Sequence, residues 1–302
     1  MLSRYGLHSK YNTLPNATEI RYDTYTIPCC VTCNSLLGKE VENPVSDIIA
    51  GGYERVANYL RTEGCLLIFV WLALIFFKTH LKDTRLRLHR DLRQPDTTIS
   101  DLYDVTALHH VHAIARAPYS RPVLDPEVFG SFLAVPASVS ANYDQFDYGD
   151  LFETHTTLIR LGDTCFIAVL DDSCASAQVC EKITDAIVPP LSPIQLRELA
   201  AHLAHANSAL KDRPQFRSIF SETEGFRIVC DRPAKVALGE MSADRYGAIL
   251  SYITDPILSQ FHNSNIDDIR RYVRAGNYTF LFDEQGRFLV NSMERLEDTS
   301  KG

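Results

Sequence analysis

The chain has 302 residues, of which 45% are hydrophobic and 23% charged, and its formal net charge is -8. This composition excludes a disordered protein and allows a core large enough for more than one subdomain. The negative charge argues against a nucleic-acid-binding surface over the whole molecule, although a local basic patch is compatible with it. Eight cysteines without regular spacing and no recognisable leader indicate a reducing compartment, so we expect a cytoplasmic protein.

The first 27 residues alternate polar and β-prone positions. Leu14, Pro15 and Asn16 predict a turn, and residues 20–27 predict a strand. We expect this strand to be the second of a hairpin.

The densest chemistry lies in residues 28–44, at a predicted strand-to-helix junction that holds thiols, a carboxamide and carboxylates. Cys30 and Cys33 have the C-x-x-C spacing at which a tight turn directs two thiolates at one zinc ion. A closed zinc site needs two more ligands, and no second C-x-x-C pair is present. The nearest further candidates are Cys29, His8 and Cys65. The pair therefore predicts half of a structural zinc site, with free thiols in a packed junction as the alternative.

An extended segment of the form N-x-T-x-I-x-Y, residues 16–22, precedes this box, and an amphipathic run with Leu36, Leu37 and Val41 follows it. Together they resemble the second half of an HNH, or ββα-metal, nuclease motif. They are most similar to bacterial HNH-like proteins in which such a segment leads into a P-C-C-x-x-C-N box. The cysteine–asparagine box carries the specific part of the resemblance, and a weaker similarity continues to about residue 235.

The resemblance implies a metal-dependent endonuclease with three functional groups. A histidine acts as general base for the water that attacks a phosphodiester, an asparagine orients that histidine, and a helix residue holds a divalent cation. Asn34 takes the asparagine role. Glu42 falls near the helix position, where an oxygen ligand suits Mg²⁺ or Mn²⁺. His8 precedes the box and is the candidate base, with a surface histidine as the alternative.

Relatives of this kind carry an upstream C-x-x-C and a Glu-His pair that supplies the base. Neither occurs in this sequence. The resemblance therefore implies either a truncated form or a degenerate member that has lost cleavage and kept the scaffold.

Two helices are expected next, one that Pro44 ends and one over residues 45–61 that Gly51 and Gly52 interrupt. Residues 65–77 form the most apolar run, which is shorter than the ~20 residues that a bilayer requires. They predict a helix buried on all sides and no membrane span.

A basic cluster follows this run and is the one such cluster of an acidic protein. Its candidate nucleic-acid-binding residues are Lys82, Arg85, Arg87 and Arg90. They would contact phosphates beside the metal motif. The alternative is the solvated end of a helix.

Three imidazoles, at His109, His110 and His112, would suit a metal if their segment were a strand. No carboxylate or thiol has matching spacing, so polar surface is the favoured interpretation and no role is assigned to them. Asp171 and Asp172 end a predicted strand, where paired acids bind a cation in some proteins and more often serve solvation.

The second half predicts a β meander and then helices. Its strands are expected over residues 129–135, 156–161 and 165–170. Ser192 and Pro193 start a helix, on which His202 and His205 are interpreted as core or boundary residues rather than metal ligands. Further helices are expected over residues 242–261 and 265–275, then a hairpin over 278–290 and a frayed tail over 291–302.

The predicted fold class is α+β. It comprises a partial ββα-metal motif, a helical segment, an antiparallel β meander with helices, and a C-terminal region of helices and a hairpin. The expected domains are residues 1–93, 94–235 and 236–302.

The leading functional hypothesis is an HNH-like endonuclease that needs Mg²⁺ or Mn²⁺, with DNA preferred over RNA as the ligand. The second is a non-catalytic nucleic-acid- or protein-binding relative whose cysteine box is structural, with zinc as its metal. A third is a scaffold protein that has no nucleic-acid role. Whether the chain is an enzyme is left open, and the C-terminal region is the candidate surface for a protein partner. No nucleotide-binding glycine loop or nucleophile elbow supports a kinase, dehydrogenase or serine hydrolase.

Overall fold

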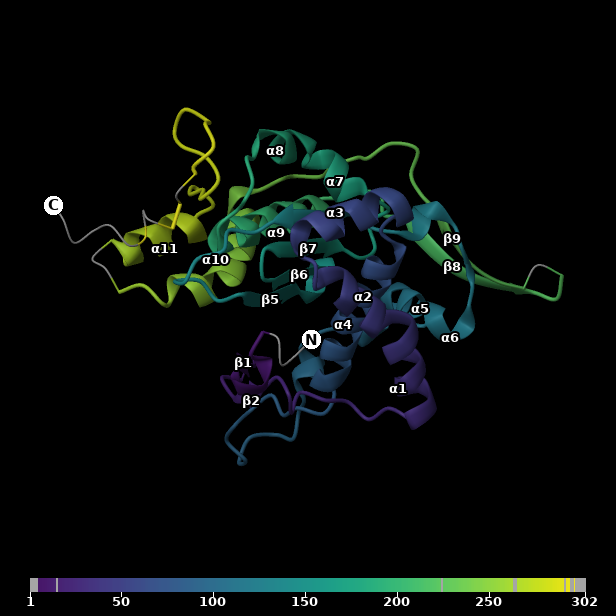
Figure 1. Cartoon of the computed structure of the whole chain (residues 1–302). Coiled ribbons are helices and arrows are strands. Elements are labelled where there is room, and N and C mark those ends of the chain that lie inside the picture. The colour runs from purple at the N-terminus through teal and green to yellow at the C-terminus, as the bar shows by residue number, and fades with distance from the viewer. Residues whose placement is uncertain are drawn as a thin grey trace. The chain divides into compact units, whose positions relative to one another are not determined.

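The computed structural model describes residues 5–14, 16–223, 225–262, 265–290, 292–293 and 296. It has the α+β fold class that the sequence predicts, with many helices and antiparallel sheets along one chain (Figure 1). The chain divides into two compact units. Unit 1 comprises Met1–Asp125 and Phe216–Val229, and unit 2 comprises Pro126–Gln215 and Cys230–Gly302. The chain passes between these units after residues 125, 215 and 229, whereas the predicted domains end at residues 93 and 235.

Unit 1 contains a short N-terminal hairpin. After the 3-10 turn η1 (Leu7–Ser9), strand β1 (Tyr11–Thr13) pairs antiparallel with β2 (Glu19–Arg21). The strand predicted over residues 20–27 therefore ends early. The amides of Thr24 and Tyr25 donate hydrogen bonds to the Arg21 carbonyl, which bends the chain into a turn.

A helical stretch follows the cysteine box. It consists of α1 (Val31–Leu37), the π-helical segment η2 (Gly38–Glu42) and α2 (Asn43–Ile49). The prediction that Pro44 ends a helix was wrong. Pro44 lies in the first turn of α2, directly after the π-helical segment, where its missing N–H is accommodated.

The predicted interruption at Gly51 and Gly52 is present. Gly52 has a φ of +74°, a left-handed conformation that favours glycine, and it begins α3 (Gly52–Glu63).

The apolar run forms the buried helix that the sequence predicts. Helix α4 (Leu66–Asp83) buries every side chain from Ile68 to Leu74, and it extends beyond the apolar run into the first residues of the basic cluster. No single helix in the described part of the chain has the length and apolar character to cross a membrane. Helices α3 and α4 together would meet that test by length and composition, with a bend of 113° between them.

The His109–His112 segment is helical, in α5 (His109–Ala115), and not a strand. Because helical side chains point in different directions at successive positions, its imidazoles separate. His110 stacks on Phe216 with ring centroids 3.5 Å apart, and His112 stacks on Phe77 at 4.7 Å.

The rest of unit 1 consists of short helices and a three-stranded sheet of order β3-β9-β8, in which β3 and β9 are parallel. The elements are η3 (Ile99–Leu102), η4 (Val105–Leu108), α6 (Ala117–Ser120), β3 (Val123–Leu124), β8 (Gln215–Ser221) and β9 (Gly225–Asp231). The last residues of β9 and the first of β8 belong to unit 2.

Unit 2 is built on an antiparallel sheet of order β4-β7-β6-β5, which confirms the predicted meander and adds one strand to it. Its strands are β4 (Phe132–Pro136), β5 (Phe146–Leu151), β6 (Thr156–Leu161) and β7 (Thr164–Val169). Every residue of β6 and β7 is buried, so the centre of this sheet is the centre of the core.

Helix α9 (Pro193–Ser208) packs on this sheet, and α10 (Ala243–Leu258) packs on α9. The other helices of unit 2 are α7 (Ala175–Val179), α8 (Glu181–Ala186) and α11 (Ile266–Arg274), with 3-10 turns η5 (Pro126–Val128) and η6 (Phe152–Thr154). The predicted start of α9 is confirmed, since Ser192 and Gln195 form a capping box with Pro193 in the first turn. Ser242 caps α10, whereas Asn265 makes no side-chain cap on α11.

The strands of the hairpin predicted over residues 278–290 do not form. One isolated bridge joins Phe282 and Phe288 around the predicted turn. Side chains of α9 occupy the backbone groups that a ladder would use: Glu198 accepts from the Phe280 amide, and Gln195 donates to the Phe280 and Leu289 carbonyls. Most of the tail predicted to fray, residues 291–302, lies outside the described residues.

We expect Gly130→Ala to destabilise unit 2 by about 1–3 kcal/mol, because the core there leaves no room for a methyl group. A Cβ at this position would collide with the Val169 carbonyl and lie 3.0 Å from Asp172 Oδ1. Urea unfolding followed by circular dichroism measures the change. The matched control is Gly38→Ala, where a Cβ meets nothing within 4 Å and the backbone is helical. The control should be neutral or slightly stabilising, and equal losses in both variants would contradict the packing argument.

Candidate functional site

The cysteine box forms the start of α1. Cys30 is the N-cap residue, and its Sγ accepts a hydrogen bond from the Cys33 amide at 3.2 Å. The Cys33 thiol also hydrogen-bonds to Cys30, which holds the pKa of Cys30 below its ordinary value and raises the pKa of Cys33. Cys30 is therefore the first of the two to become a thiolate.

Tyr119 lies beside these thiols. Its hydroxyl donates a hydrogen bond to the Cys33 carbonyl at 3.4 Å. Burial, and then the neighbouring Cys29, Cys33 and Cys30, raise the pKa of Tyr119 to about 12. The phenol therefore stays protonated and remains a hydrogen-bond donor next to the thiol pair.

The described residues contain no group of three or more His, Cys, Asp or Glu side chains placed to hold a metal ion. Cys30 and Cys33 thus offer two of the four ligands of a tetrahedral zinc site. Glu42, the predicted Mg²⁺ or Mn²⁺ ligand, is half-buried, and its Oε1 forms an ion pair with Lys78 Nζ at 2.9 Å.

The predicted catalytic residues lie on separate elements. His8 is exposed in η1, immediately before β1, and Asn34 is exposed in α1. Figure 1 shows the β1–β2 hairpin and the start of α1 well apart, joined by residues 22–30. The chain therefore has a hairpin followed by a helix, as in a ββα motif, without bringing these two elements together.

The basic cluster is partly neutralised by its own surroundings. Arg87 pairs with Asp96 at 2.6 Å, and the neighbouring Arg93 pairs with Asp91 at 2.7 Å. Lys82 donates to the Thr26 carbonyl. These interactions hold local segments together and reduce the capacity of the cations to bind a ligand.

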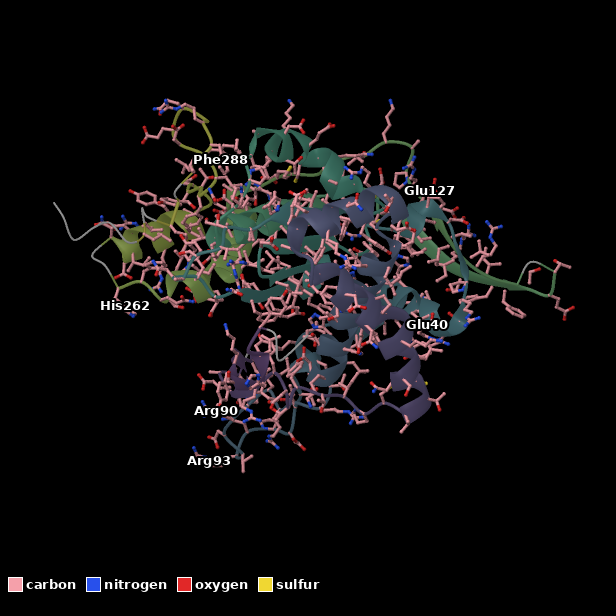
Figure 2. All side chains as sticks on the ribbon, in the orientation of Figure 1. Glu40, Arg90, Arg93, Glu127, His262 and Phe288 are labelled. Atoms are coloured by element: carbon pink, nitrogen blue, oxygen red, sulfur yellow. The ribbon has the colours of Figure 1, made fainter. Side chains whose placement is uncertain are left out.

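Three cations of the cluster have no carboxylate partner among the residues that the structure describes. They are Lys82, Arg85 and Arg90. Arg90 donates to the Ala17 carbonyl at 3.2 Å, in the loop of the hairpin, and Figure 2 shows it and Arg93 at the edge of unit 1. The positive surface is therefore smaller than the sequence suggests and lies beside the hairpin.

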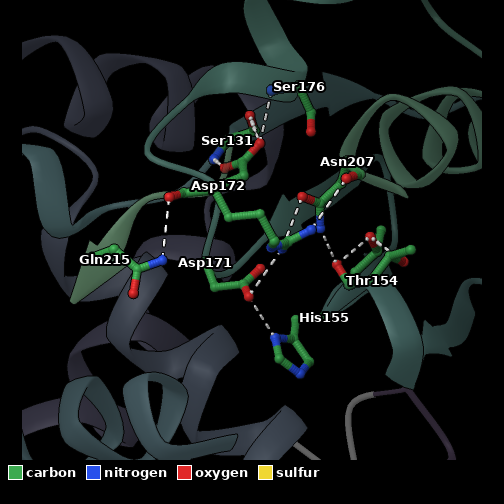
Figure 3. A network of polar contacts seen from close by, with 10 residues as sticks. Ser131, Thr154, His155, Asp171, Asp172, Ser176, Asn207 and Gln215 are labelled. Carbon is green, nitrogen blue, oxygen red and sulfur yellow. Dashed lines mark hydrogen bonds and ion pairs between the residues drawn. The ribbon is translucent and has the colours of Figure 1, made fainter. Parts of the chain in front are cut away.

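A second polar site, in unit 2, surrounds the turn that follows β7 (Figure 3). Asp172 is buried there and accepts hydrogen bonds from the Ser131 amide at 2.6 Å, the Ser131 hydroxyl at 2.7 Å and the Ser176 amide at 2.8 Å. Burial raises the pKa of this carboxyl, and the hydrogen bonds oppose that shift. Asp172 therefore fastens the start of β4 to the start of α7.

The adjacent Asp171 points the other way (Figure 3). Its Oδ2 lies 2.9 Å from His155 Nδ1 and 3.2 Å from Arg213 Nη2. Arg213 in turn donates to Asn207, which donates to the Thr154 carbonyl. The acid pair considered for a cation is thus divided between two separate networks, and no cation site results.

Backbone strain gathers around the same turn. Of the five described residues other than glycine that have left-handed φ values, three lie here: His155 at +43°, Ser173 at +49° and Cys174 at +65°. Such conformations are costly and concentrate at functional sites. The sequence carries no signal for this strain, because the Asp171–Cys174 run has no glycine to mark a left-handed turn.

Comparisons with protein-family models, curated proteins and solved structures found no significant match to this chain.

We expect iodoacetamide to alkylate Cys30 at a lower pH than Cys33, because the hydrogen bond between the thiols stabilises the Cys30 thiolate. Mass spectrometry of peptides after alkylation at graded pH measures both. In Cys30→Ser the pKa of Cys33 should fall, since its hydrogen bond to Cys30 is the largest cause of its increase. Buried Cys165 is the unreactive reference. Zinc added beforehand should protect both thiols, and EDTA should restore their reactivity.

Coincident pH profiles for Cys30 and Cys33 would contradict the opposite shifts of their pKa values. Alkylation at an undiminished rate in the presence of zinc would show that Cys30 and Cys33 do not bind zinc.

Proposed function

We propose that this chain is a nucleic-acid-binding relative of HNH endonucleases in which Cys30 and Cys33 supply two thiolates to a structural zinc site. The observation that carries the proposal is the thiol pair at the start of α1, with Cys30 exposed and Cys33 half-buried. Their side chains are hydrogen-bonded, which favours Cys30 as a thiolate. Zinc binds deprotonated cysteine, so a pair with one lowered pKa is suited to it. All eight cysteines are free thiols, which supports a reducing compartment such as the cytoplasm.

The candidate nucleic-acid surface comprises Lys82, Arg85 and Arg90. Phosphate contacts provide most of the affinity of nucleic-acid-binding proteins, and only cations free of carboxylate partners contribute fully. Arg87 belongs to the same cluster, but its ion pair with Asp96 makes it a weaker contributor. DNA is the first ligand to test, and RNA the second.

Cleavage is the second candidate function. The exposed position of Asn34 directly after Cys33 favours it, since an asparagine there would be accessible to a general base and a metal-bound phosphate. The separation of the β1–β2 hairpin from the start of α1 weighs against it, because His8 adjoins that hairpin. Binding without catalysis is therefore the first choice.

We expect the triple substitution Lys82→Gln, Arg85→Gln and Arg90→Gln to weaken DNA binding at least about tenfold near 0.1 M salt, and to reduce the slope of log K against log salt by about 2 to 3. Fluorescence anisotropy with a labelled duplex, and with RNA of the same sequence, measures this. Glutamine retains a donor for the carbonyls of Thr26 and Ala17. Arg93→Gln is the matched control, because Asp91 already neutralises this exposed arginine. Equal losses in the control and the triple variant would contradict the proposed surface.

For the second candidate, purified protein is incubated with plasmid and Mg²⁺ or Mn²⁺. Nicking that Asn34→Ala abolishes, and that the neighbouring exposed Ser35→Ala retains, would assign catalysis to this box. Cleavage that survives Asn34→Ala would remove the nuclease assignment from this motif. Thermal unfolding of each variant excludes a folding defect as the cause.

A further inference from the structure

Unit 2 contains a small pocket, of about 100 Å³, beside the strained turn after β7. Its walls come from that turn, from the chain that follows α9, and from the segment Arg232 to Val236 after β9. Pockets that enclose drug-sized ligands begin at about 300 Å³, so this one suits only a small chemical group. None of its lining residues takes part in the function proposed above.

Ser173 provides a hydroxyl to this pocket. Its side chain is only 7% exposed, and no nitrogen or oxygen of the described residues forms a hydrogen bond with its Oγ. Its one hydrogen-bonding neighbour among these residues is the thiol of Cys230, and a thiol is a weak partner that a phosphate oxygen can replace. Because buried hydroxyl groups are normally hydrogen-bonded, Ser173 is suited to receive a polar ligand.

Two cations line the pocket as well. Arg232 and Lys235 are both exposed, and neither has an ion-pair partner within the described part of the chain. A guanidinium presents a planar fork of donors to phosphate oxygens, and an ammonium adds a compact positive charge. The combination of arginine, lysine and a serine hydroxyl is typical of sites that bind phosphoryl groups.

Two carboxylates also line the pocket, and they differ in their effect. Asp172 is fully buried, and both of its oxygens accept hydrogen bonds from Ser131 or Ser176. Burial also raises the pKa of Asp172, which favours its neutral form. Asp212 is exposed and remains the one carboxylate expected to repel an anion. The described residues offer no metal-binding group here, so the acids do not make a cation site.

We propose that this pocket binds a phosphoryl group, with Arg232 and Lys235 supplying the positive charge and the Ser173 hydroxyl donating a hydrogen bond. The ligand is inorganic phosphate or the terminal phosphate of a monoester, since the volume excludes an enclosed base or sugar. The proposal does not depend on the zinc pair or on the basic cluster of unit 1.

Isothermal titration calorimetry of the full chain with inorganic phosphate tests the proposal, with sodium chloride at equal ionic strength as the reference. We expect saturable binding that Arg232→Gln and Lys235→Gln each weaken about tenfold or more. Ser173→Ala should weaken it severalfold, whereas Asp212→Asn should strengthen it severalfold. Lys182→Gln, an exposed lysine of α8 outside the pocket, is the matched control and should leave binding unchanged.

Glycerol phosphate in place of inorganic phosphate distinguishes the two sources. Tighter binding of the monoester assigns a phosphorylated organic ligand, and tighter binding of inorganic phosphate assigns the free anion. The proposal is overturned if wild-type protein shows no saturable heat beyond the chloride reference. It is also overturned if Lys182→Gln weakens binding as much as Arg232→Gln, or if Asp212→Asn binds no more tightly than wild type.

Discussion

Unit 2 depends on a helix that has no exposed face. In α9 every residue from Pro193 to Asn207 is buried except His202, including an arginine and a glutamate. A buried charge without a partner costs several kcal/mol, so each must be paired within the fold. Arg197 pairs with Asp147 of β5 at 2.5 Å, and Glu198 accepts from the Thr279 hydroxyl at 2.6 Å. The helix is therefore fixed to the sheet on one side and to the C-terminal segment on the other.

The sequence predicts the apolar half of this arrangement and not the polar half. Periodicity identifies a helix, its cap at Ser192 and its apolar positions, because these signals are local. No local signal predicts that a second face of α9 is covered by a segment some eighty residues later. This contact is the reason that the predicted C-terminal hairpin does not form. Its backbone groups bond to Gln195 and Glu198 instead of to each other. Strand β5 was missed for a related reason, since its Asp147, Gly149 and Asp150 have low β propensity and its pairing with β6 holds it in the sheet.

In the candidate sites too, local contacts are predictable from the sequence and contacts with distant residues are not. The C-x-x-C spacing alone predicts the contact between Cys30 and Cys33, because residues three apart meet in one helical turn. The roles of charged residues depend on distant partners and could not be predicted. Asp96, in a loop nine residues away, neutralises Arg87, and the hairpin loop accepts the hydrogen bond of Arg90. The division of the adjacent acids after β7 could not be predicted either, because Asp171 and Asp172 lie in a turn where strand alternation does not apply.

In a chain with a net charge of -8, anion binding is decided by pairing rather than by composition. Charges at the surface act over roughly 8 Å at physiological salt, so a cation beside its own carboxylate offers little to a ligand. This criterion removes Arg87 from the basic cluster and leaves Lys82, Arg85 and Arg90. The same criterion selects Arg232 and Lys235 in unit 2, which composition does not distinguish from any other exposed cation. Both proposed anion sites thus follow from one property, positive charge without a carboxylate partner. Each test therefore compares the proposed cations with a control cation, the neutralised Arg93 for the first site and the distant Lys182 for the second.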